Sequence, residues 1–164
     1  MSRVGFWAWA AAEPERVAII EVDGREVTFG ELAARVHRTA RGLQQRGLRR
    51  GDVIATVLRN RSECFEAFLA ALNCGWYYVP VNHHATADDI RYIVGNSEAR
   101  AVLVDPEFAD QAREALEASA LPAAMRLVAG EAAGFVPLAA LREGQSAERP
   151  DFSVAGQVMQ YTSG

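Results

Sequence analysis

Residues 65–82, FEAFLAALNCGWYYVPVN, join an apolar helical pattern to an apolar strand and decide the fold. Four large apolar side chains recur at the i, i+3, i+4, i+7 spacing that lines one side of a helix: Phe65, Phe68, Leu69 and Leu72. We expect this face to be buried. Gly75 can take the left-handed conformation that closes a helix, and Tyr77-Tyr78-Val79 then forms a short strand that ends at Pro80. Because that strand is apolar on both faces, it belongs inside a parallel sheet covered by helices.

The composition is that of a globular protein with one domain. The chain has 164 residues, of which 50% are hydrophobic and 23% are charged. A net charge of −4 without any run of Lys or Arg argues against direct nucleic-acid binding. No stretch reaches the roughly 18 apolar residues of a membrane-spanning helix. Cys64 and Cys74 match neither a metal-binding nor a redox spacing, so we predict buried thiols in a reducing compartment.

The N-terminus allows two interpretations. Arg3 followed by VGFWAWAAA has the short apolar run of a secretory signal, although only one positive charge precedes it. Two tryptophans in so short a run favour the other interpretation, an amphipathic helix over Gly5–Ala12 whose Phe6 and Trp9 dock on the body of the protein. We therefore predict a first helix and a cytoplasmic protein.

The next segments predict a hairpin and then alternating strands and helices. Two β-prone runs, 17–21 and 25–28, flank Asp23-Gly24, the strongest short-range hairpin signal. Thr28 and Glu31 have the spacing of a capping box for the following helix, with Leu32, Val36, Ala40 and Leu43 on its buried face. Further strands are predicted at 53–58, 77–79, 101–104, 125–128 and 157–161, with helices between the earlier ones.

Three sets of polar residues are predicted to begin the later helices. Asn60 or Ser62 would cap the central helix, Thr86 the next one, and Asp105-Pro106 a third. Residues 129–150 are rich in Gly, Ala, Pro and Glu and are predicted to form a surface connection, with one helical turn at 137–142. The predicted fold class is α/β: an open, mostly parallel sheet with helices on both faces, plus an N-terminal β-hairpin, in one domain over residues 1–164.

Four stretches are candidate sites because ligands of open parallel sheets bind beyond the carboxyl ends of the strands. They are Arg59-Asn60, Asn82-His83-His84, Asp105, and Thr162-Ser163-Gly164. The last could begin a phosphate-binding loop, since glycine leaves backbone N–H groups accessible and the two hydroxyls add donors, but the same tripeptide occurs in ordinary turns.

The remaining polar pairs favour structural roles. Adjacent side chains diverge in extended backbone, so His83-His84 is better explained as a loop pair than as a metal site. Asp88-Asp89 suits the first turn of a helix, where carboxylates favour the positive end of the dipole. No metal site is predicted.

Four ordered motifs together resemble the N-terminal part of the adenylate-forming enzymes, a family that includes acyl-CoA synthetases, aryl-CoA ligases, luciferases and peptide-synthetase adenylation domains. The matches are Val27–Leu32 (VTFGEL) with "TYxEL", Gly47–Asp52 and the following VIATVL with "GVxxGDxVA", Leu72–Asn82 with "LxxGxxxVPxN", and Gln160–Gly164 (QYTSG) with the start of "YTSGTTGxPKG". Asn82 and the run to Asp88 are similar to the acyl-CoA synthetase branch, although Ala85 replaces its usual leucine.

The resemblance implies an ATP-dependent acid–thiol ligase. A carboxylate would attack the α-phosphate of Mg-ATP to give an acyl-adenylate and pyrophosphate, and the thiol of coenzyme A would then displace AMP. Thr162, Ser163 and Gly164 match positions that contact the pyrophosphate end of ATP. The family's lysines, magnesium ligand and acyl pocket match nothing up to Gly164, so no catalytic residue is carried over and the chain alone is expected to be inactive.

The expected cofactors are ATP, Mg²⁺ and coenzyme A for the full-length enzyme, and the expected substrate is a fatty, aromatic or steroid-like carboxylic acid. Two alternatives stay open: a non-catalytic α/β module for binding or dimerisation, and a fragment of a peptide-synthetase adenylation domain. The sheet edge beside 157–161 is expected to expose apolar surface and to favour self-association, for example as a homodimer.

Overall fold

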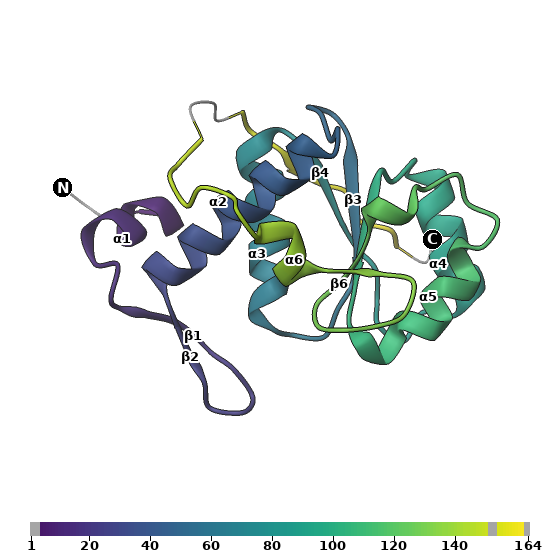
Figure 1. Ribbon diagram of the computed structural model, residues 1–164, viewed down its shortest axis with the longest axis horizontal. Coiled ribbons are helices and arrows are strands. Elements are labelled where there is room, and N and C mark those ends of the chain that lie inside the picture. Colours follow the sequence, from purple (N-terminus) through teal and green to yellow (C-terminus); the bar gives the residue numbers. More distant parts are fainter. Residues whose placement is uncertain (1–3, 151–153, 163–164) are drawn as a thin grey trace.

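The computed structural model describes residues 4–150 and 154–162, and it confirms the predicted α/β architecture. A parallel sheet lies between two layers of helices, with a two-stranded hairpin extending from one end (Figure 1). The first part of the chain forms α1 (Phe6–Ala12), β1 (Val17–Ile20), β2 (Glu26–Thr28) and α2 (Phe29–Gln45). The sheet region adds β3 (Val53–Val57), α3 (Ser62–Cys74), β4 (Tyr77–Pro80), α4 (Ala87–Asn96) and β5 (Ala101–Val104).

The last third of the described chain completes the sheet. It forms the 3-10 turn η1 (Pro106–Phe108), α5 (Ala109–Leu116), the 3-10 turn η2 (Ala123–Met125), β6 (Arg126–Val128), β7 (Val136–Pro137), α6 (Leu138–Arg142) and β8 (Gln157–Val158). The sheet order is β7-β6-β5-β3-β4-β8, and every neighbouring pair is parallel. Helices α2, α3 and α6 cover one face and α4 and α5 cover the other (Figure 1). None of the helices in the described ranges has the length and apolar character needed to cross a membrane.

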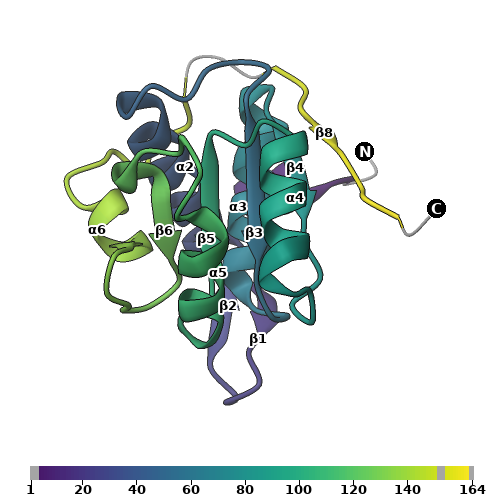
Figure 2. The same cartoon turned by 90° about the vertical axis from the view of Figure 1, so that its right-hand side faces the viewer.

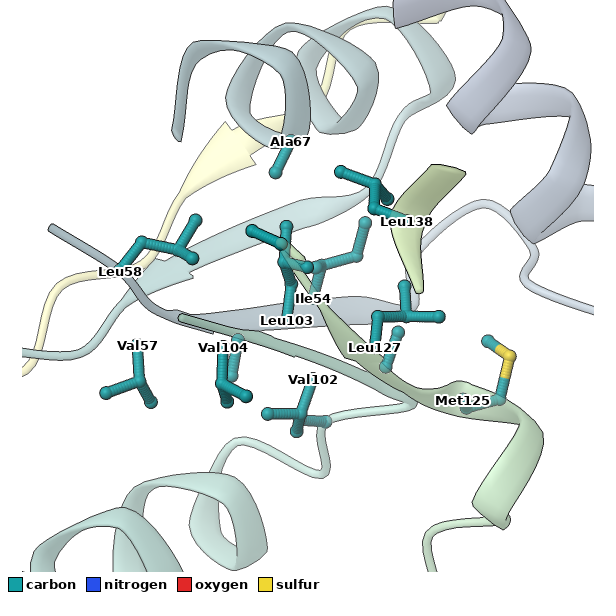
Figure 3. Close-up of a cluster of buried hydrophobic side chains, with 14 of the residues drawn as sticks. Ile54, Val57, Leu58, Ala67, Val102, Leu103, Val104, Met125, Leu127 and Leu138 are labelled. Carbon is teal, nitrogen blue, oxygen red and sulfur yellow. The ribbon is translucent and has the colours of Figure 1, made fainter. Parts of the chain in front are cut away.

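The core lies on both faces of the central strands. β3 and β5 are buried along their whole length, as expected for short continuous apolar runs in the middle of a parallel sheet. Figure 3 shows Ala67 and Leu138 above the sheet and Val102 and Val104 below it. The residues at the start of β4 are also inside: Trp76 and Tyr78 are buried, and the Tyr78 hydroxyl accepts a hydrogen bond from Thr56.

The orientation predicted for α3 is wrong. Phe65 is 53% exposed, and Phe68, Leu69 and Leu72 are only partly buried. The face turned towards the sheet and α2 instead carries small or polar residues: Glu63, Glu66, Ala67, Ala70, Ala71, Asn73 and Cys74. Small side chains let the helix approach the sheet and α2 closely, which large apolar residues would prevent. The Phe/Leu face is therefore left at the side of the helix, where Phe68 contacts the Tyr78 ring edge-on at a centroid distance of 5.5 Å.

The N-terminal predictions hold in most respects. Helix α1 begins at Phe6, and the rings of Phe6 and Trp9 pack against Phe29. The turn between β1 and β2 places Gly24 at φ +84°, which a glycine adopts without strain. Thr28 accepts the amide of Glu31 as a helix cap, but the Glu31 carboxylate pairs with Arg35, so the predicted capping box is only half formed. The complete box is instead at α4, between Thr86 and Asp89.

Three further expectations need correction. Neither Asn60 nor Ser62 caps α3: its N-cap residue is Arg61, which makes no side-chain cap bond. The connection 129–150 is not only surface, because it adds β7 to the sheet and buries Leu138 and Leu141 of α6. Of the two cysteines, which are both free, Cys74 is buried as predicted and Cys64 is only half-buried.

Candidate functional site

The carboxyl ends of β3, β4 and β5 lie at one rim of the sheet, since these strands are mutually parallel. β8 is parallel to β4, with Gln157 opposite Tyr77 and Val158 opposite Tyr78, so the terminal segment runs towards the same rim. Figure 2 shows it as the outermost strand beside β4. All four predicted stretches therefore follow strands that point in one direction.

The terminal segment is held by backbone bonds and by one tyrosine. Gln157 N donates to Trp76 O at 3.1 Å and Met159 N to Tyr78 O at 2.9 Å, so the pairing is shorter than the strand predicted over 157–161. The Tyr161 hydroxyl donates to Oδ1 of Asn96, the last residue of α4, at 2.7 Å. Thr162 follows and is exposed, while Ser163 and Gly164 lie outside the described residues. The segment thus leans over α4 as it leaves β4.

Asn82-His83-His84 forms a compact turn beyond β4. Asn82 Oδ1 accepts the amide of His84 at 2.9 Å, and the two imidazole rings lie 4.1 Å apart. His83 also lies against Phe108, at a ring distance of 5.8 Å. Within residues 4–150 and 154–162, no three His, Cys, Asp or Glu side chains are arranged to hold a metal ion. Tyr161 instead bonds to Asn96, at the end of α4 that leads into β5, and Met159 lies beside the residues that begin β3, β4 and β5. The structure therefore does not bring the terminal segment together with the Asn82-His83-His84 turn.

Arg59-Asn60 and Asp105 are brought together. Oδ2 of the buried Asp105 accepts the amide of Arg59 at 2.6 Å, and Oδ1 pairs with Arg61. Asp105 therefore fastens the end of β5 to the end of β3. It occupies the predicted N-cap position before Pro106, but its side chain makes no cap bond to η1. With the hairpin turn, these residues line a crevice of about 580 Å³.

The ion pairs beneath the crevice fix its charge states. Burial acts to lower the pKa of Arg61, but hydrogen bonds to Glu63 and Asp105 outweigh it and raise the pKa above its usual range. Burial acts to raise the pKa of Glu63, but the hydrogen bond from Arg61 outweighs it, and the pKa of this carboxyl lies below its usual value. Both groups are therefore charged at neutral pH. Sequence reasoning missed Arg61, whose only signal was its position directly after the Arg59-Asn60 stretch.

Comparison with known proteins gives a consistent family. Residues 6–164 match the family model described as AMP-binding enzyme. A 3-oxocholest-4-en-26-oate–CoA ligase of Rhodococcus rhodochrous is 32% identical over 108 residues, which is 66% of this chain and 19% of the relative. A sulfoacetate–CoA ligase of Cupriavidus necator is 28% identical over 156 residues, covering 94% of this chain and 31% of the relative.

A solved structure extends the match to the fold. The structure described as a long-chain-fatty-acid CoA ligase from Rhodopseudomonas palustris superimposes with a TM-score of 0.80 at 28% identity, over 96% of this chain and 40% of that one. The chain spans less than half the length of each of these relatives. The family model covers far more than half of the chain, and the protein therefore belongs to the AMP-binding enzyme family.

Proposed function

We propose that the chain is the N-terminal portion of an ATP-dependent acyl-CoA synthetase. The whole enzyme would join a carboxylic acid to ATP, release pyrophosphate, and transfer the acyl group from AMP to the thiol of coenzyme A. One observation carries the proposal: β8 runs parallel to β4, so Gln157–Val158 has the chain direction that leads to the rim where ligands of parallel sheets bind. Thr162-Ser163-Gly164 would begin the phosphate loop there.

The chemistry of this end of the chain suits a phosphate better than a cation. Thr162 is exposed and offers a hydroxyl donor, and Asn82 and His84 are exposed at the end of the neighbouring strand. Donors of this kind stabilise the charge that develops on a departing pyrophosphate. The magnesium ligand and the acyl pocket are assigned to no residue of this chain, so the 164-residue protein alone is expected to be inactive.

The proposed substrate is a fatty, aromatic or steroid-like carboxylic acid. The relatives named above act on a steroid-type acid and on sulfoacetate, and both are CoA ligases, which supports CoA ligation. A peptide-synthetase fragment and a non-catalytic binding or dimerisation module are the rivals. Three expectations remain predictions: a cytoplasmic location, the single-domain organisation, and self-association through the sheet edge beside residues 157–161.

A chimera tests the proposal. Residues 6–164 would replace the matching segment of the C. necator sulfoacetate–CoA ligase, which already aligns with 94% of this chain. ATP–pyrophosphate exchange is expected with sulfoacetate, because the host supplies the acyl pocket, and the 164-residue chain alone should show none. A folded chimera without any exchange would favour the non-catalytic module.

A further inference from the structure

The crevice at the ends of β3 and β5 lies at the topological switch point of the sheet. From β3 the chain passes to β4 on one side and then crosses to β5 on the other, so the connections diverge between β3 and β5. Open α/β sheets bind ligands in the crevice outside the carboxyl ends of the strands at this point. In this protein one wall of the 580 Å³ crevice is formed by the strand ends and the other by the hairpin turn, residues 21–25.

The hairpin places a carboxylate in this crevice. The Glu21 side chain is only 8% exposed, and its Oε1 accepts the amide of Ser62, the first residue of α3, at 3.1 Å. Arg25 Nη2 lies 3.5 Å from the same oxygen. Negative charge is stabilised at the amino end of a helix, and here that charge comes from the hairpin turn, forty-one positions earlier in the chain.

The arginines of the crevice are already paired. Arg59 pairs with Glu107 at 2.6 Å, and Arg61 pairs with Asp105 and Glu63. With Glu21 on Arg25, each of the three arginines lining the crevice has a carboxylate partner. Four carboxylates, Glu21, Asp23, Asp105 and Glu107, line the crevice beside these three arginines, so no arginine there is left to attract an external anion.

We propose that the β1–β2 hairpin is a built-in plug for the switch-point crevice, in which the Glu21 carboxylate takes the place of an anionic ligand. A small carboxylate could then reach the amino end of α3 only when Glu21 is absent or the hairpin has moved away. The proposal concerns the hairpin and not the terminal segment, so it stands or falls independently of the proposed function.

Removal of the plug tests the proposal with acetate as the probe. In Glu21→Ala the melting temperature is expected to fall by about 2–6 °C, because the buried amide and Arg25 lose their partner. Sodium acetate should raise the melting temperature of Glu21→Ala most of the way back to that of wild type, and sodium chloride at equal ionic strength should not. In NMR spectra, acetate should shift the Ser62 amide resonance of Glu21→Ala and leave that of the wild-type protein unchanged.

Two further variants keep the test decisive. Glu26→Ala removes an exposed carboxylate from the same hairpin and should behave as wild type in both measurements. Glu21→Gln keeps the volume and a neutral acceptor, so it should fold even if the alanine variant does not, with a smaller acetate shift at Ser62. The proposal is overturned if acetate does not shift the Ser62 amide resonance in either Glu21 variant. It is also overturned if acetate shifts that resonance in Glu26→Ala as much as in the Glu21 variants.

Discussion

The Tyr161 hydroxyl donates a hydrogen bond to Oδ1 of Asn96 at 2.7 Å, and this bond ties the end of the described chain to the last turn of α4. The Tyr161 ring also meets the Tyr92 ring edge-on, at a centroid distance of 6.4 Å. Two backbone bonds to β4 precede these contacts. The position of Thr162 therefore depends on α4 as well as on the sheet.

Tyr161→Phe should loosen the terminal segment and leave the rest of the fold intact. The variant loses one neutral hydrogen bond, worth about 0.5–1.5 kcal/mol, and keeps the ring contact. Hydrogen exchange of the amides at 159–162 should become faster. Tyr92→Phe is the matched control, because it keeps the same ring pair and leaves the bond to Asn96 in place. Equal exchange rates in the two variants would contradict this role.

Gly156 is required for β8 to approach the sheet. A Cβ atom there would lie 2.3 Å from Ala71 O and 2.4 Å from Trp76 O, and backbone atoms cannot move aside as a flexible side chain can. Gly156→Ala should cost about 1–3 kcal/mol and should remove exchange protection from the amides of Gln157 and Met159. In Gly95→Ala, within α4, the new Cβ meets nothing within 4 Å, and we expect a gain of about 0.5–1 kcal/mol. Protected β8 amides in Gly156→Ala would refute the close-approach argument.

The buried carboxylate of Glu66 joins three helices. It is fully buried in α3, accepts a hydrogen bond from Thr39 of α2, and lies 3.0 Å from Arg142 of α6. Burial raises the pKa of Glu66, and the charge of Arg142 opposes that shift. The pair therefore fastens α6 to the α2–α3 layer.

Arg142→Ala should destabilise the protein by about 3–5 kcal/mol, because the Glu66 carboxyl would stay buried without a charged partner. Arg113→Ala breaks an ion pair with Asp110, whose side chain is 94% exposed, and should change the free energy of unfolding by less than about 1 kcal/mol. Urea denaturation of the two variants measures the difference. Similar losses in both would mean that burial of Glu66 has no special cost.

Stability should fall in mild acid because of His37. This buried ring stacks on Trp7 of α1 at 5.1 Å, its Nδ1 lies 2.8 Å from Ala147 O, and its buried Nε2 has no partner within the described residues. Burial lowers the pKa of His37, and the charges of Arg149 and Arg41 lower it further, while the bond to Ala147 opposes them. The folded protein therefore favours the neutral ring.

The unfolded chain binds a proton at His37 near its ordinary pKa of 6.5, before the folded protein does. The contribution of His37 to stability is therefore fully present above this pH and is lost as the pH falls below it. Chemical denaturation of His37→Gln and wild type across this range should give curves that converge in acid. His84→Gln, at an exposed position, should parallel wild type throughout. Parallel curves for His37→Gln would rule out the effect.

Local sequence patterns predicted most of the fold because they depend on near neighbours. β3 and β5 are buried on both faces, so their continuous apolar runs identified them directly, and Gly75, at φ +71°, closes α3 as expected. The orientation of α3 was not predictable in this way. Its buried face carries Glu66, and the arginine that makes this burial tolerable lies seventy-six positions away.

The candidate site shows the same division. The rule that ligands meet the carboxyl ends of parallel strands correctly selected Arg59-Asn60 and Asp105 as neighbours of a crevice. The N-cap position of Asp105 was predicted correctly, but its side-chain partner was not, because a capping pattern is local while Arg61 lies forty-four positions earlier. The hairpin was predicted from Asp23-Gly24, but nothing in its sequence placed Glu21 at the amino end of α3.

The most direct test of the central claim is ATP–pyrophosphate exchange by the chimera carrying Thr162→Val and Ser163→Ala together. If these hydroxyls begin the phosphate loop, exchange should fall by a factor on the order of 10–10³ as transition-state donors are lost. Gln160→Ala, an exposed neighbour on the same segment, should leave exchange unchanged. An unaltered rate in the double variant would contradict the assignment of this segment to the nucleotide site.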